Sequence, residues 1–305
     1  MYTYSLPQWL AFFYLYCFFG WIFESSYVSL KEHRFVNRGF LRLPMLPLYG
    51  SGAVMMLWVS LPVQDNLFLV YISGVIAATA LEYVTGYVME RLFKVRYWDY
   101  SNQKFQIHGY ICLSSSIAWG FLTIFMTEII HQPVSELVLS IPSYSLNLSL
   151  ILLTALFAAD AYESTKEALA LGQALEAMTK MKEEIEEIQA KILVLKEEAA
   201  DHASLVRAEA VHRLYEMKLE AEEKLSAAKE ETREHLEEIR ENTKERLSQL
   251  TLQLEDAQKR RKALHSGTGL RRFYRKGLLQ GNPGAASSRF SEALKELRDM
   301  LEQGE

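Results

Sequence analysis

The sequence contains little cysteine and none of the common catalytic motifs. Cys17 and Cys112 are its only cysteines, and both lie in apolar runs without a neighbouring cluster of His or Cys. A disulfide framework and a zinc site are therefore not expected. The phosphate loop G-x-x-x-x-G-K-[ST] is missing, as are the patterns H-E-x-x-H and G-x-S-x-G. We expect a protein that is not an enzyme, needs no cofactor and does not bind ATP as an ABC ATPase does.

Charge is scarce in the first half of the chain and abundant in the second. Half of the residues are hydrophobic and 23% are charged, an ordinary average that hides this separation. Up to about residue 159 the chain is apolar and aromatic, whereas Glu, Lys, Arg, Ala and Leu dominate beyond residue 166. This predicts an all-α protein with a polytopic membrane domain at residues 1–165, embedded in the lipid bilayer. The net charge of −5 argues against a nucleic-acid partner.

Five apolar segments are candidate membrane spans. They cover residues 9–30, 45–61, 67–89, 110–130 and about 146–164. The first lacks the basic start and the cleavage site of a signal peptide, so we expect it to be retained. The second is short and contains Pro47, Gly50 and Gly52. A full crossing and a re-entrant hairpin are both open for this segment.

Lysine and arginine are missing from two of the four loops between these spans. Loops 62–66 and 131–145 have neither residue. The other two loops carry the basic residues Lys31, Arg34, Arg38 and Arg42, and Arg91, Lys94, Arg96 and Lys104. Because basic loops stay in the cytoplasm, this alternation predicts an outside N-terminus and a cytoplasmic C-terminus. We expect a multi-pass protein of the plasma membrane.

Polar residues gather near the predicted cytoplasmic ends of the spans. Glu82 and Glu90 share one helix face with Gly86, and Glu82 would lie inside the apolar slab. A charge there is costly and usually has a partner or a task. We therefore predict a pocket for a substrate, an ion or a partner protein, and a structural ion-pair network is the alternative. Its candidate residues are Glu24, Asn37, Arg38, Glu82, Glu90, Arg96, Trp98, Asp99 and Asp160.

Five ordered motifs in the first half resemble one bacterial membrane family. They are GWIFE (20–24), NRGFLRLPMLPLYG (37–50), LEYVTGYVMERLF (81–93), RYWDYS (96–101) and ICLSSSIAWG (111–120). The resemblance is to putative ABC-transporter type IV, the CmpB-like permeases, over about residues 8–165. It implies a permease-like subunit that relies on a separate ATPase or another energy source. Gln106 departs from the family pattern, in which we expect Asn.

The second half has helical periodicity and no proline before Pro283. We predict a long cytoplasmic helix or coiled coil over residues 166–265. Its seam contains Leu171, Ala174, Met178, Met181, Ile185, Ile188, Ile192, Leu195 and Ala199. A parallel homodimer would cover this stripe, and a fold-back hairpin or a single charged helix are the alternatives. His202 and His235 lie at or near the seam, where a structural role is expected.

The last segment, residues 266–305, reads as a flexible linker followed by a short amphipathic helix. The stretch GNPGAASS (281–288) has turn-forming composition, and Phe290, Leu294, Leu297 and Leu301 form one apolar stripe. Two functions fit the whole sequence. One is an ABC-transporter permease-like subunit without its own ATPase. The other is a membrane-anchored coiled-coil scaffold or regulator that recruits cytoplasmic partners.

Overall fold

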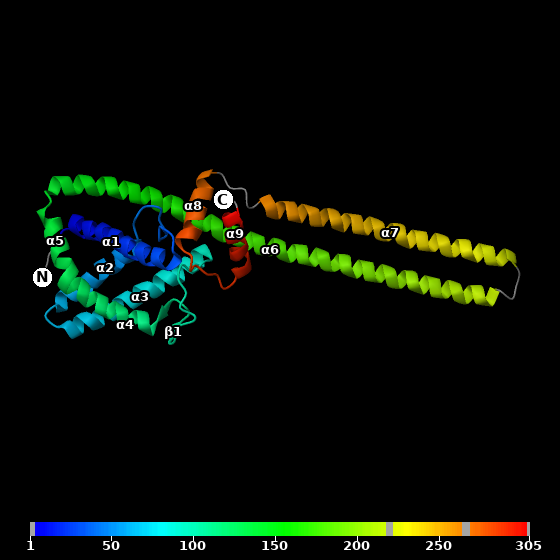
Figure 1. Cartoon of the computed structure of the whole chain (residues 1–305), viewed down its shortest axis with the longest axis horizontal. Helices are drawn as coiled ribbons and strands as arrows, with labels where there is room; N and C mark the ends of the chain where they lie inside the picture. The colour runs from blue at the N-terminus through cyan, green and yellow to red at the C-terminus, as the bar shows by residue number, and fades with distance from the viewer. Residues whose placement is uncertain (1–3, 218–221, 264–268, 304–305) are drawn as a thin grey trace. The chain divides into compact units, whose positions relative to one another are not determined.

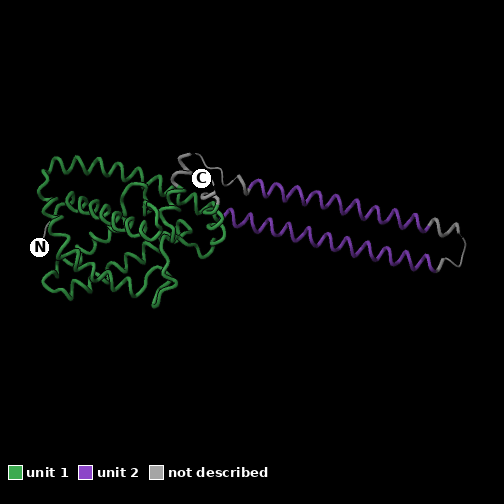
Figure 2. The backbone as a smooth tube through the Cα atoms, in the orientation of Figure 1, with its two compact units in different colours: residues 1–175, 267–305 green, residues 176–266 purple. Residues whose placement is uncertain are grey.

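The computed structural model describes residues 4–217, 222–263 and 269–303, which form two compact units. Unit 1 combines Met1–Leu175 with Gly267–Glu305, and unit 2 is Glu176–Ser266 (Figures 1 and 2). The described residues are almost entirely helical, as predicted. Two short strands, β1 (Gln106–Ile107) and β2 (Ile111–Cys112), form an antiparallel hairpin in unit 1.

Unit 1 is a helical bundle whose neighbours in sequence are neighbours in space. Its first helices are α1 (Leu6–Glu32), α2 (Pro47–Ser60), α3 (Leu67–Phe93) and α4 (Leu113–Phe125). These helices pack in order, α1 on α2, α2 on α3 and α3 on α4, and run back and forth in Figure 1. Phe12, Cys17 and Leu57 lie at the centre of the apolar core.

Local signals set the ends of these helices. Ser5 and Gln8 form a capping box at the start of α1. Asn66 caps α3 by accepting hydrogen bonds from the amides of Phe68 and Leu69. Gly20 gives α1 its close approach to α2, because a side chain there would collide with Tyr49.

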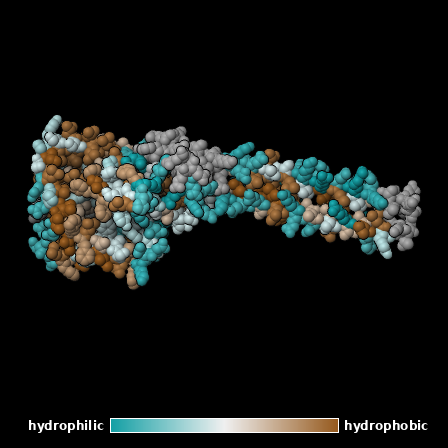
Figure 3. All heavy atoms as spheres, viewed as in Figure 1, coloured by the Kyte–Doolittle hydropathy of each residue, from teal (hydrophilic) through white to brown (hydrophobic). Residues whose placement is uncertain are grey.

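Four helices of unit 1 are long and apolar enough to cross a membrane. They are α1, α3, the first part of α6 (Ser143–Met217), and the run Leu113–Ser140. The run consists of α4, the π-helical η2 (Met126–Ile130) and α5 (His131–Ser140). Apolar side chains cover much of the bundle face seen in Figure 3. The exposed apolar residues of the bundle include Phe68, Ile76 and Phe121. Such a surface fits insertion into lipid.

The second predicted span, residues 45–61, is the short helix α2. Its 14 residues and the three of the adjoining 3₁₀ helix η1 (Leu61–Val63) rise about 25 Å at roughly 1.5 Å per residue. The hydrocarbon core of a bilayer is about 30 Å thick. The fourth predicted span also begins later than expected, because residues 110–112 belong to the β-hairpin.

The predicted domain boundary at residue 165 has no counterpart, because α6 continues through it without a break. Ala168 packs against Phe93 and Tyr97, and Leu171 and Leu175 are also buried. Unit 1 therefore includes about ten residues of α6 beyond residue 165.

Unit 2 is an antiparallel hairpin of the second part of α6 and α7 (Glu222–Ala263). Ile185 and Ile188 of the predicted seam pack against Ala257, with Leu250 and Leu254 beside them. Arg260 adds an ion pair of 3.1 Å to Glu184. The chain therefore covers its own seam, the fold-back arrangement that the sequence left open beside a parallel homodimer.

The C-terminal part of unit 1 contains two helices and a buried connection, where the sequence predicted a flexible linker and one helix. Residues Gly269–Gly281 form α8 and Ser291–Gln303 form the expected amphipathic helix α9. Between them, Asn282, Ala285 and Ser287 are buried. Turn-forming composition predicted a free segment, but these residues pair with loops of the bundle. In α9, Leu294 and Leu297 are buried as predicted, whereas the side chain of Leu301 lies outside the described residues.

Candidate functional site

Glu82 lies inside α3, only 5% exposed, and is hydrogen-bonded by three neutral donors. The Tyr100 hydroxyl donates to Oε1 at 3.1 Å. The Trp119 indole Nε1 and the Ser115 hydroxyl donate to Oε2 at 2.9 and 3.3 Å. Among the described residues, no Lys or Arg forms an ion pair with Glu82. The sequence left a polar pocket and an ion-pair network open, and the hydrogen-bond donors of Glu82 are neutral residues that it did not identify.

Glu24 of α1 belongs to the same polar region. The Tyr49 hydroxyl donates to its Oε1 at 2.9 Å, and Arg38 Nε lies 3.7 Å from its Oε2. Tyr100 interacts electrostatically with both Glu24 and Glu82. Burial, followed by the charge of Glu82, raises the pKa of Tyr100 above its ordinary value, so Tyr100 remains a proton donor.

These contacts define one group, which we name the carboxylate cluster. It consists of Glu24, Tyr49, Glu82, Tyr100, Ser115 and Trp119. Its members come from α1, α2, α3, α4 and the loop after α3. Glu82, which is held by hydroxyl and indole donors and has no ion pair among the described residues, could accept a proton or a cation.

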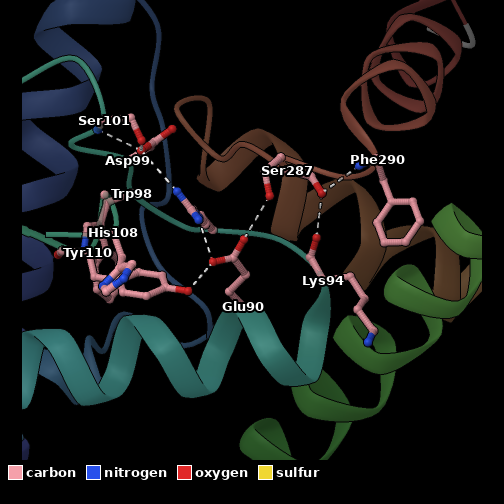
Figure 4. Close-up of polar contacts among 12 residues, drawn as sticks. Glu90, Lys94, Trp98, Asp99, Ser101, His108, Tyr110, Ser287 and Phe290 are labelled. Carbon is pink, nitrogen blue, oxygen red and sulfur yellow. Dashed lines mark hydrogen bonds and ion pairs between the residues drawn. The ribbon is translucent and has the colours of Figure 1, made fainter.

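A second group, the loop network, contains Glu90, Arg96, Trp98, Asp99 and Tyr110. Glu90, Trp98, Asp99 and Tyr110 are labelled in Figure 4. Arg96 Nε pairs with Glu90 Oε2 at 2.7 Å, and the Tyr110 hydroxyl donates to the same oxygen. Arg96 Nη1 lies 3.6 Å from Asp99 Oδ1. The Trp98 indole donates to the carbonyl of Tyr110 at 2.9 Å and ties the β-hairpin to this loop.

Asp99 also fixes the turn that follows it. The backbone amide and the hydroxyl of Ser101 both donate to Asp99 Oδ1, at 2.9 and 2.5 Å. Burial pushes the pKa of Asp99 up, but the Ser101 hydrogen bonds and the Arg96 charge outweigh it and lower the pKa. For Glu90, Arg96, Trp98 and Asp99, the contacts are those of the structural network that the sequence offered as the alternative.

Asn37 and Asp160 hold the loop between α1 and α2. Asn37 Oδ1 accepts from the Trp21 indole at 2.6 Å, and its Nδ2 donates to the Arg42 carbonyl at 3.0 Å. Asp160 of α6 accepts from the amides of Arg42 and Leu43, both at 2.9 Å. Asp160 therefore positions this loop.

Arg38 connects the carboxylate cluster to the C-terminal segment. Besides Glu24, its guanidinium donates to the carbonyls of Tyr97 and Gly281, at 3.4 and 3.3 Å, and to the side-chain oxygen of Asn282. The structure thus unites Glu24, Arg38 and Glu82 in one region and Glu90, Arg96, Trp98 and Asp99 in another. Sequence analysis missed Tyr49, Tyr100, Ser115, Trp119 and Asn282; four of them lie in the quoted family motifs, whereas nothing in the sequence marked Asn282.

The described residues offer little support for other kinds of site. They contain no group of three or more His, Cys, Asp or Glu arranged to hold a metal. An open groove of about 710 Å³ runs between α1 and α6, and its lining includes Leu10, Ile151 and Ala155. None of the nine candidate residues lines this groove.

The first half of the chain matches the family described as "Putative ABC-transporter type IV" over residues 11–165. The chain belongs to this family. All nine candidate residues and the whole carboxylate cluster lie within the matched part, whereas unit 2 and the C-terminal segment lie outside it. No curated protein and no solved structure matches the chain.

Proposed function

We propose that the protein is a permease-like membrane subunit of an ABC-type transporter, with ATP hydrolysis supplied by a separate protein. Membership of the family and the four apolar helices support this proposal. The absence of a phosphate loop from the sequence fits a subunit that performs no ATP chemistry itself. The observation that carries the proposal is Glu82, a carboxylate inside an apolar helix.

Carboxylates at such positions commonly mark a path for a substrate or an ion. Three hydrogen bonds from neutral groups replace part of the hydration that Glu82 loses inside the bundle. Since all three donors are neutral, an arriving cation or proton would meet an uncompensated negative charge. This is the chemistry expected of a substrate or coupling-ion site, and it is absent from the loop network, where Arg96 already neutralises Glu90.

We place the protein in the plasma membrane with its N-terminus outside and its C-terminus in the cytoplasm. The concentration of Lys and Arg in residues 31–42 and 91–104 supports this orientation. Both polar groups and the hairpin of unit 2 would then be accessible to cytoplasmic proteins. A separate ATPase is the partner that this role requires, and no nucleic acid or cofactor enters it.

We also propose that two copies associate through unit 2. Its hairpin exposes Leu193, Val194 and Leu252, and a groove of about 520 Å³ between α6 and α7 has Val194 and Leu250 in its lining. A second hairpin would remove this apolar surface from water. The homodimer would then be formed by paired hairpins, because the original seam is already covered within each chain.

The subunit proposal is tested by isolating the tagged full chain from its native membrane in mild detergent. We expect a second protein carrying G-x-x-x-x-G-K-[ST] to copurify and to hydrolyse Mg-ATP. The Glu82→Gln complex should keep this subunit but change its hydrolysis rate several-fold. Intact complexes that contain no such ATPase would contradict the proposal.

A membrane-anchored scaffold is the second candidate, favoured by the 91-residue unit Glu176–Ser266, which has interaction surface and lies outside the family match. Replacing residues 176–266 by a short Gly-Ser linker separates the two functions. A permease subunit should keep its ATPase, since unit 1 carries the family part. A scaffold should lose its cytoplasmic partners while unit 1 remains in the membrane.

A further inference from the structure

The segment between α8 and α9 docks on the loops of the bundle like a bound peptide. We name residues 281–290 the docked tail. The Arg96 amide donates to the Ala286 carbonyl at 2.7 Å, and the Ala286 amide donates to the Arg96 carbonyl at 2.9 Å. This reciprocal pair is an antiparallel β-bridge. Extended peptides use the same backbone contact when they add as a strand to the exposed edge of a β-sheet.

Side chains make the docking selective for sequence. Asn282 is 2% exposed, and its Nδ2 donates to the carbonyls of Gly39 and Leu278 at 3.0 and 2.8 Å. Its oxygen accepts from Arg38, so both ends of the buried amide are satisfied. At position 281 only glycine fits, since a Cβ there would lie 2.5 Å from the Asn37 carbonyl oxygen.

The far end of the docked tail is anchored as well (Figure 4). The buried Ser287 hydroxyl donates to the Lys94 carbonyl at 2.8 Å and accepts from the Phe290 amide at 3.2 Å. The Ser288 hydroxyl lies 3.4 Å from Glu90 Oε1. The side chain of Phe290 is itself buried. Contacts therefore extend along the segment rather than depending on one residue.

We propose that these loops form a docking surface for an extended peptide of the pattern Gly-Asn-x-x-x-Ala-Ser. Its receptor residues are Asn37, Arg38, Gly39, Glu90, Lys94 and Arg96. All six lie within residues 11–165, whereas the occupant lies outside the family match. The occupant of this surface is the chain's own docked tail. This inference does not depend on transport.

Docking is connected to the carboxylate cluster through Arg38. Its Nε lies near Glu24, while its other two nitrogens contact Tyr97, Gly281 and Asn282. A guanidinium has five donor hydrogens in a rigid fork. Undocking removes two of its acceptors and leaves Arg38 free to approach Glu24. Occupancy of the surface therefore sets the charge environment of Glu24.

The test uses the full chain with Asn282→Ala and Ala286→Pro, which together remove the buried amide and the donor to Arg96. Gly284→Ala is the matched control, because an added Cβ at Gly284 meets nothing within 4 Å. The first readout is hydrogen–deuterium exchange at the Arg96 amide. We expect exchange at least tenfold faster in the double variant and unchanged in the control. Unchanged exchange in the double variant overturns the proposal.

The second readout is fluorescence anisotropy with a labelled synthetic peptide of residues 279–298. A tethered segment competes at an effective concentration of about millimolar, so wild type and Gly284→Ala should bind the free peptide at least tenfold more weakly than the double variant. A peptide carrying both substitutions should lose binding to the double variant. Equal binding by wild type, or none by a double variant of normal helicity, overturns the proposal. If the double variant loses helicity, Asn282→Ala alone is used with the same readouts.

Discussion

At the scale of single residues, Glu82 shows how an apolar helix holds a carboxylate with neutral hydrogen-bond donors. Hydroxyl and indole groups from two other segments point at its two oxygens. Hydrogen bonds to a charged group contribute about 1.5–3 kcal/mol each. The position of Glu82 in an apolar run predicted its importance, but no periodicity links it to Tyr100 or Trp119. Their convergence depends on how the helices pack, which the sequence pattern does not encode.

Glu82→Gln should lower the free energy of unfolding, since one of the two acceptor oxygens becomes an NH₂ group. We expect a loss of about 1–3 kcal/mol, from hydrogen bonds that no longer form. Reversible unfolding from mild detergent into SDS measures this change. Glu128→Gln is the control, because Glu128 is exposed and should change stability by less than about 0.5 kcal/mol.

A double-mutant cycle shows whether the effect comes from the cluster itself. Trp119→Phe removes the indole donor, and combined with Glu82→Gln it should give a coupling energy above about 0.5 kcal/mol. Independent, additive effects would mean that the Trp119 hydrogen bond contributes nothing to holding Glu82.

At the scale of elements, the hairpin of unit 2 resolves the question of what covers the heptad stripe. The sequence placed Ile185 and Ile188 on a seam correctly, and Ala257 of the same chain completes their packing. Periodicity identifies a stripe but not its partner, because a second copy and a second helix offer equivalent apolar positions. The sequence pattern did not predict the docked tail either. Most contacts of this segment are made to backbone groups, which leave no pattern of side-chain types.

Replacing Ile185 and Ile188 by Asp should open the hairpin. Two charges would be buried against Ala257, and α7 would lose its packing partner. We expect hydrogen exchange along α7 to accelerate at least tenfold in the full chain. Leu205→Asp, at a side chain that is 66% exposed, is the matched control and should leave exchange unchanged. Protected α7 amides in the double variant would rule out this packing.

Association of two hairpins is a separate prediction at this scale. The full chain in detergent should sediment as a dimer at micromolar concentration. Leu193→Glu with Val194→Glu should yield monomers, because both exposed side chains lie where apolar surface would be buried. Ser204→Glu changes an exposed residue outside the groove lining and should leave the dimer intact. A monomeric wild type would refute the proposed homodimer.

At the scale of the whole molecule, the account depends on which side of the membrane each part faces. The alternation of basic and uncharged loops predicts this orientation from the sequence alone. The number of crossings is harder to read from sequence, because α2 is apolar but short. A cytoplasmic ATPase can engage the protein only if unit 2 or the loop network faces the cytoplasm.

The most direct test of the account is cysteine labelling of intact cells with a membrane-impermeant maleimide. Ser145→Cys, at an exposed position near the start of α6, reports one side, and Ser204→Cys, exposed in unit 2, reports the other. The parent chain gives the background, since Cys17 and Cys112 are both buried. The account predicts labelling at position 145 in intact cells and at position 204 only after lysis. Labelling at position 204 but not at 145 in intact cells would contradict it.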